Sequence, residues 1–229
     1  MRNDRGLYGA VRRTIQVMTQ GMLAIVLVML TAAAPAHAAD KVILAFGDSL
    51  TAGYGLKPAE AFPAQLEAAL RRDKIAVRVQ NAGVSGDTTA QARARLDWVL
   101  RSMKQKPDLV IVQLGGNDML RGIDPAQTRA NLSAILAELK KRKMPVLLAG
   151  MLAAPNLGSD YARKFNPIYP ALAKQYGAAL YPFFLRGVTG NPKLLLKDNM
   201  HPTGPGVAVV VRGIAPSVKK ALGQAGIQR

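Results

Sequence analysis

The alternation of short apolar runs with longer stretches of helical spacing constrains the fold of this chain more than any other feature. The five runs are Val42–Phe46, Val77–Gln80, Leu109–Leu114, Val146–Met151 and Leu180–Phe183. Most of them are apolar on both faces, which is typical of strands in a parallel sheet that is covered on each side. The runs therefore predict a buried, five-stranded parallel sheet.

Between the runs, apolar residues recur at the spacing of one helix face. They are Phe62, Leu66, Ala69 and Leu70, then Ala92, Leu96, Val99, Leu100 and Met103, then Leu132, Ile135, Leu136 and Leu139, and finally Val207, Val210, Val211, Ile214 and Val218. Strands that alternate with helices of this size predict an open, doubly wound α/β sandwich. Pro216 is expected to kink or split the last helix. With no repeat, low-complexity tract or linker, residues 39–229 are expected to form a single domain.

The first residues have the features of a secretory signal peptide. Four arginines precede an uncharged apolar run, Met22–Ala34, and small residues at Ala36 and Ala38 form an A-x-A cleavage site. We expect residues 1–38 to be removed on export. The apolar run is short for a membrane anchor, which needs about 20 residues. Arg12-Arg13 leaves the choice between general and twin-arginine export open.

Composition narrows the chemistry. Without the leader the chain has 27 Lys and Arg, 13 Asp and Glu and a net charge of +14, which favours anionic surfaces such as phospholipid headgroups. The cations are scattered and not interleaved with aromatic residues, so nucleic acid is not expected as a partner, and a merely solvated basic face is the simpler interpretation. There is no Cys, and only one His, His201, lies outside the leader. A thiol nucleophile and a zinc site are therefore not expected.

In an open α/β sheet, ligands bind at the carboxyl ends of the strands. After the first run comes "GDSLTAG", in which Ser49 is expected to open a helix with its hydroxyl and N–H at the positive end of the helix dipole. A serine there can simply cap the helix. The G-x-S-x-G elbow of the α/β-hydrolase fold does not occur, which disfavours that fold.

The next two loops contribute candidate hydrogen-bond donors. "NAGVSGDTT" follows the second run, and the amide of Gly86 in it can approach a ligand closely. "GGNDML" follows the third run, and the neutral side-chain amide of Asn117 can donate to a developing oxyanion. Taken alone, each loop can equally be an ordinary turn.

The stretch "KDNMHPTGPG" places Asp198 three residues before His201. A carboxylate at that spacing can accept from one ring nitrogen and leave the other free to take a proton. In a flavodoxin-like strand order 2-1-3-4-5, Ser49, Gly86 and Asn117 converge at one sheet edge, with the Asp198/His201 loop alongside. Each of these four features could occur by chance alone. Their joint occurrence in loops that meet at one sheet edge is much more probable for an active site.

The blocks "GDSL", "SGDT", "GGND" and "DNMH", in this order, resemble those of the SGNH (GDSL) hydrolase family, and in particular its bacterial exported thioesterase, lysophospholipase and arylesterase branch. The resemblance runs from Lys41 to about Leu222. It implies a flavodoxin-like three-layer sandwich with Ser49 as nucleophile and Asp198 and His201 completing the triad. It also implies an oxyanion hole formed by Ser49, Gly86 and Asn117, with no cofactor.

These implications give an expected function. The protein is expected to be a serine esterase acting on small acyl esters, thioesters or lysophospholipids. It is also expected to be exported, periplasmic and monomeric, with transient contact to anionic lipid. Met119–Asp124 and Ala153–Tyr161 are expected to line its acyl pocket. Two alternatives remain open. One is a carbohydrate O-acetylesterase of the same superfamily, and the other is a non-catalytic basic binding protein of the cell envelope.

Overall fold

The computed structural model describes residues 40–227, so the expected signal peptide lies outside the described residues. Five parallel strands form one sheet in the order β2-β1-β3-β4-β5. They are β1 (Lys41–Gly47), β2 (Val77–Gly83), β3 (Leu109–Gln113), β4 (Val146–Ala149) and β5 (Ala179–Tyr181). This order is the predicted one, and it places β1 and β3 at the centre of the sheet.

The burial of each strand follows from its position in the sheet. Every residue of β3 and all but the first residue of β1 are buried, as expected for strands covered on both faces. In β2, by contrast, exposed residues alternate with buried Val77 and Val79, because it is an edge strand with one solvated side.

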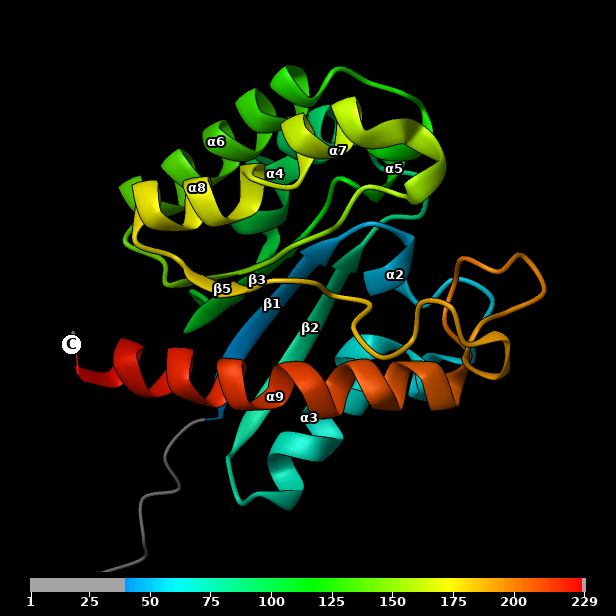
Figure 1. The fold of residues 1–229 in the computed structure, drawn as a ribbon. Coiled ribbons are helices and arrows are strands. Elements are labelled where there is room, and N and C mark those ends of the chain that lie inside the picture. Colours follow the sequence, from blue (N-terminus) through cyan, green and yellow to red (C-terminus); the bar gives the residue numbers. More distant parts are fainter. Residues whose placement is uncertain (1–39, 228–229) are drawn as a thin grey trace, which may run out of the picture. The chain divides into compact units, whose positions relative to one another are not determined.

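Helices cover both faces of the sheet (Figure 1). On one face lie α4 (Thr89–Ser102), α6 (Pro125–Lys141), α7 (Gly158–Phe165) and α8 (Ile168–Tyr176), and on the other lie α3 (Phe62–Arg72) and α9 (Gly204–Ile227). Short helices α2 (Ser49–Ala52) and α5 (Gly116–Leu120) follow β1 and β3, and 3₁₀ turns occupy Pro58–Glu60, Pro155–Leu157 and Pro192–Leu194. The architecture is the predicted three-layer α/β sandwich.

The predicted helix faces form the core. Leu66 and Leu70 of α3, Leu132 and Ile135 of α6, and Ile214 of α9 are completely buried. A local sequence signal also marks the start of one of these helices. Thr88 and Gln91 form a reciprocal capping box at the start of α4.

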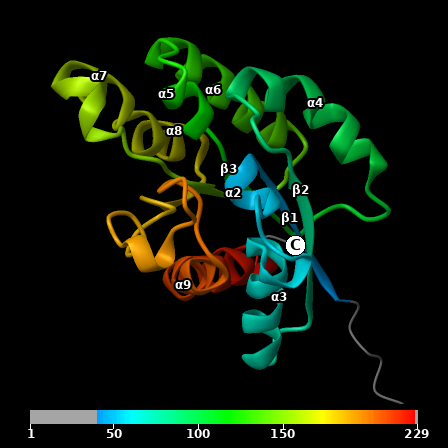
Figure 2. The same ribbon diagram turned by 90° about the vertical axis from the view of Figure 1, so that its right-hand side faces the viewer.

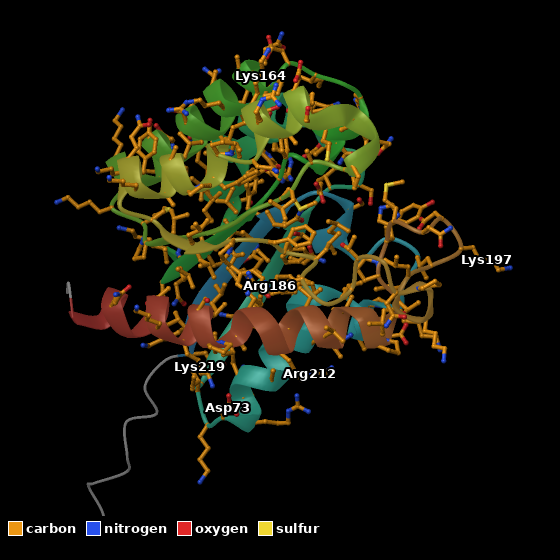
Figure 3. All side chains as sticks on the ribbon, viewed as in Figure 1. Asp73, Lys164, Arg186, Lys197, Arg212 and Lys219 are labelled. Atoms are coloured by element: carbon orange, nitrogen blue, oxygen red, sulfur yellow. The ribbon has the colours of Figure 1, made fainter. Side chains whose placement is uncertain are left out.

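The last helix is continuous, so of the two expected effects of Pro216 the split does not occur. α9 contains Pro216 but is a single helix and is not split (Figure 1). Its apolar residues Val207, Val211, Ile214 and Val218 are buried against the core on both sides of the proline, so tertiary packing holds the two halves together. An exposed ion pair between Lys219 and Asp73, the C-cap residue of α3, also joins the two helices on this face (Figure 3).

In the described part of the chain, no helix is both long and apolar enough to cross a membrane.

Candidate active site

A pocket of about 290 Å³ opens at the carboxyl ends of the central strands. Figure 2 views this end of the sheet, with α2, α5 and the loop that precedes α9 around it. Four of the five residues of the predicted site line this pocket, namely Ser49, Gly86, Asn117 and His201. Asp198 lies directly behind the histidine.

Ser49 is the first residue of α2, immediately after β1. Asp48, not the serine, caps the helix, because its Oδ1 accepts the N–H of Leu50 at 3.0 Å. The serine hydroxyl is therefore not used as a cap. A Cβ at Gly47 would lie 2.1 Å from Thr51 Oγ1 and 2.6 Å from the Gln113 carbonyl oxygen, so only glycine permits this sharp turn from strand to helix.

The loop that carries the acid and the histidine is closed by backbone pairing. Leu195 and Pro202 form an antiparallel bridge, and the N–H of Leu196 donates to the carbonyl of His201 at 2.7 Å. Asn199 takes a left-handed φ of 56°, which asparagine tolerates better than most residues. These contacts fold the chain back so that Asp198 and His201 face each other.

Ser49, His201 and Asp198 form a continuous hydrogen-bonded chain. His201 Nε2 lies 2.8 Å from Ser49 Oγ, and Nδ1 lies 2.7 Å from Asp198 Oδ2. Because a carboxylate can only accept, Nδ1 carries the proton and Nε2 is free to accept the serine proton. The other oxygen of Asp198 accepts the backbone N–H groups of Met200 and His201, which fixes the carboxylate.

The charge on Asp198 is stabilised by these donors. Partial desolvation raises its pKa, but the bonds from the backbone and ring of His201 and from the Met200 N–H outweigh that effect, and the net pKa lies below the ordinary value. The carboxylate is therefore ionised beside the imidazole, where it can stabilise an imidazolium.

The two remaining predicted donors, Gly86 and Asn117, also line the pocket. Gly86 has a φ of 86° in a turn closed by the Asp87 N–H and the Val84 carbonyl, and a residue at this position of such a turn needs a positive φ. Arg121 Nη2 donates to the Gly86 carbonyl at 2.8 Å and holds the loop from outside. Asn117 lies in the first turn of α5, and its Nδ2 donates to the Asp87 carbonyl at 3.0 Å.

Sequence reasoning missed a residue that joins two of these loops. Arg95 of α4 donates through Nε to Asp87 Oδ2 at 2.6 Å and through Nη2 to the Gly47 carbonyl at 2.9 Å. Its guanidinium also stacks over Phe46, 4.4 Å from the ring centroid. In the sequence Arg95 is one of many scattered cations, and its position on the face of α4 shared with Ala92 and Val99 is the one signal that distinguishes it.

Tyr54 was also missed. Its ring centroid lies 4.5 Å from that of His201 at an interplanar angle of 38°, and it lines the pocket while remaining half exposed. Nothing in the spacing of "GDSLTAGYG" predicts this contact.

Asp48 is a third unanticipated group, a buried carboxyl among the residues that line the pocket. Complete burial raises its pKa to about 7, against the opposing effect of the bond from the Leu50 N–H, and the nearby carboxylates Asp87 and Asp118 raise it further. Asp48 is therefore protonated in mildly acidic solution, unlike Asp198.

Most of the remaining lining is apolar. Its large side chains are those of Leu50, Met119, Leu120, Met151, Leu185 and Met200. The expectation for Met119–Asp124 is met by its first two residues. The expectation for Ala153–Tyr161 is wrong, since no residue of that segment lines the pocket. The segment instead forms a 3₁₀ turn and the start of α7, with Tyr161 donating to the Ile123 carbonyl.

Within residues 40–227, no group of three or more His, Asp or Glu side chains could hold a metal ion.

Comparisons with known proteins identify the family of this chain. A model of the GDSL-like lipase/acylhydrolase family matches residues 45–209. Esterase TesA of Pseudomonas aeruginosa is 37% identical over 90% of this chain and 98% of its own length. Thioesterase 1/protease 1/lysophospholipase L1 of Escherichia coli K12 is 39% identical over 72% of this chain and 77% of its own.

A solved structure indicates the same family. The crystal structure of AlinE4, an SGNH-hydrolase family esterase, superposes with a TM-score of 0.70 at 55% identity and covers 81% of this chain and 98% of its own. The chain belongs to the GDSL-like lipase/acylhydrolase family, the SGNH hydrolases.

Proposed function

We propose that this protein is a serine esterase that hydrolyses small acyl esters or thioesters, lysophospholipids included, through an acyl-enzyme on Ser49. The single observation that carries the proposal is the unbroken chain from Ser49 Oγ through the two ring nitrogens of His201 to Asp198 Oδ2, with links of 2.8 and 2.7 Å. A nucleophile, a base and an orienting carboxylate in this order are what acyl transfer requires.

In the acylation step, Ser49 Oγ attacks the carbonyl carbon while its proton passes to His201 Nε2. The carbonyl oxygen becomes an oxyanion, for which the N–H groups of Ser49 and Gly86 and the side-chain amide of Asn117 are the proposed donors. The ionised Asp198 stabilises the imidazolium that forms. Collapse of the intermediate breaks the bond to the leaving group, which takes the proton from Nε2.

In deacylation, water replaces the leaving group. His201 Nε2 takes its proton, the hydroxide attacks the acyl carbon, and collapse releases the acid and returns the proton to Ser49. No step requires a cofactor.

The apolar wall supports an acyl chain as the group bound beside Ser49. Methionine and leucine side chains accommodate flexible hydrocarbon well and offer no partner for sugar hydroxyls. The wall therefore favours an acyl esterase over a carbohydrate O-acetylesterase, and the intact triad favours either enzyme over a non-catalytic binding protein.

We further propose that residues 1–38 are a cleaved leader, that the protein works in the periplasm as a monomer formed by residues 39–229, and that it contacts anionic lipid transiently. The intact mass of the exported protein tests the cleavage, since it should correspond to a chain that starts at Ala39.

The test of function is a ladder of p-nitrophenyl esters from acetate to palmitate, a matching ladder of acyl-coenzyme A thioesters, and an acetylated oligosaccharide. We expect turnover of esters that depends on chain length and is lost in Ser49→Ala. Ser85→Ala is the matched control, because Ser85 also lines the pocket. Activity on the acetylated oligosaccharide alone would favour the carbohydrate esterase, and no activity on any substrate would overturn the proposal.

A further inference from the structure

Large apolar side chains gather outside the pocket as well as inside it. Among the described residues six large hydrophobic side chains are markedly exposed, namely Tyr54, Val84, Trp98, Leu120, Leu152 and Met200. Three of them, Tyr54, Leu120 and Met200, line the pocket itself. Val84 and Leu152 are the immediate neighbours of two further lining residues, Ser85 and Met151.

Three of the six thus line one opening and two more adjoin residues that line it, and we call these five the apolar rim. They come from five different segments that meet at the carboxyl end of the sheet, including α5 and the loops after β2 and β4 (Figure 2). Single exposed apolar residues scattered over a surface need no explanation, but a cluster around a functional opening marks an interaction site. Their exposed fractions, from 40% to 53%, leave a large share of each side chain to be covered.

Cations accompany the rim. Arg121 directly follows Leu120, Lys197 is three residues before Met200, and Lys57 is three residues after Tyr54; all three are exposed. Lys197 extends outward from its loop, away from the sheet (Figure 3).

The carboxylates in these segments are engaged in local bonds. Asp198 accepts from His201, Glu60 accepts the Lys57 N–H, and Asp124 accepts the Ala126 N–H. The positive charges beside the rim thus lie near carboxylates that already have hydrogen-bond partners, and without residues 1–38 the net charge of the chain is +14.

We propose that the apolar rim docks on an anionic lipid–water interface, so that the pocket receives acyl substrates directly from the lipid phase. Apolar side chains with flanking Lys and Arg are the combination that binds such a surface, since the side chains enter the acyl boundary and the cations face the headgroup charges. The inference rests on the proposed function, because an opening placed against lipid is useful only if the pocket hydrolyses acyl groups.

Docking also explains why apolar residues occupy these solvent-exposed positions of the rim. A soluble substrate needs only the inner wall, and nothing inside the pocket requires an apolar side chain at Val84 or Leu152.

The experiment uses the exported protein, its N-terminus established by intact mass, and two probes. One is co-sedimentation with vesicles of phosphatidylglycerol or of phosphatidylcholine, and the other is hydrolysis of p-nitrophenyl butyrate without lipid. The rim variant is Val84→Ser with Leu152→Ser, neither of which lines the pocket. Its matched control is Trp98→Ser, which removes a more exposed apolar side chain from α4, away from the rim.

We expect the rim variant to bind phosphatidylglycerol vesicles about tenfold more weakly, from the apolar area withdrawn from lipid, with butyrate hydrolysis unchanged. Lys197→Gln should weaken binding about fivefold on phosphatidylglycerol and not on phosphatidylcholine. Trp98→Ser and Lys220→Gln, a cation near the far end of α9, should bind as the wild type does.

Three outcomes would overturn the inference while leaving the esterase intact. They are normal butyrate hydrolysis with no binding to either vesicle, equal losses in rim and control variants, and self-association in lipid-free solution that the rim variant abolishes, which would make the rim a contact between two copies. Loss of butyrate hydrolysis in the wild type would instead count against the proposed function.

Discussion

The carbonyl oxygen of Asp87 accepts a hydrogen bond from Nδ2 of Asn117 across 3.0 Å. The bond uses one of the two N–H groups of the amide and fixes the plane of the side chain, so that the second N–H has a defined direction beside Ser49 and Gly86 in the same pocket. A donor held in place before the reaction stabilises a developing charge without reorganisation at the moment of attack. The loop after β2 thus orients the donor that follows β3.

Replacement of Asn117 by alanine should therefore lower kcat by ~10²–10³ and leave KM nearly unchanged, because the lost bond forms mainly in the transition state. Steady-state kinetics on p-nitrophenyl butyrate measures both constants. A sharp rise in KM at constant kcat would identify Asn117 as a substrate-binding residue and remove it from the oxyanion hole.

Arg95 should be needed for stability. Arg95→Met leaves Asp87 buried without its cation and should lower the free energy of unfolding by about 3 kcal/mol, as measured by urea denaturation. Arg101→Met is the matched control on the same helix. Its ion pair with Asp97 is largely exposed, so the loss should be below about 1 kcal/mol. Equal losses in the two variants would contradict a special role for Arg95.

Asp48 should make stability depend on pH. Its pKa is about 7 in the folded protein and 3.8 in the unfolded chain. As pH rises from about 4 to 7, the unfolded chain therefore releases this proton while the folded protein keeps it, and the free energy of unfolding decreases. The total effect is on the order of 4 kcal/mol and is complete above pH 7.

The variant Asp48→Asn cannot ionise and keeps the acceptor for the Leu50 N–H. Its stability relative to the wild type should therefore increase between pH 4 and pH 7, as followed by urea denaturation of both proteins across that range. Parallel stability profiles would show that Asp48 does not titrate as proposed.

Asp198→Asn should disturb the orientation of the His201 ring without disturbing the fold. The asparagine oxygen can still accept the backbone N–H groups of Met200 and His201, but the amide nitrogen cannot accept from Nδ1. We expect kcat to fall by up to ~10⁴ because the required tautomer is lost. The free energy of unfolding should change by less than about 1 kcal/mol. Turnover close to that of the wild type would mean that Asp198 does not act through His201.

Much of this architecture could be predicted from the sequence because its signals are local. Buried strands such as Leu109–Gln113 are apolar throughout, and the periodic faces of α3, α4, α6 and α9 are read directly from spacing. The site followed from topology, since parallel strands bring the loops after β1, β2 and β3 to one edge.

What the sequence did not predict depends on distant contacts. The pair α7–α8 was not predicted, although Ile168, Leu172 and Ala173 have helical spacing, because Pro155 and Pro167 interrupt the segment. The Arg95–Asp87 bond and the Tyr54–His201 contact join residues whose approach is set by packing alone. The continuity of α9 across Pro216 was likewise decided by its buried face.

The most direct test of the account is covalent labelling of the exported protein with a fluorophosphonate probe, followed by mass spectrometry of the labelled peptide. The probe phosphonylates a serine only when a neighbouring base and an oxyanion hole activate it. We predict one adduct per chain, on Ser49, which is absent from Ser49→Ala and unchanged in Ser85→Ala. An adduct on Ser85, or labelling that persists in Ser49→Ala, would contradict the assignment of Ser49 as the nucleophile.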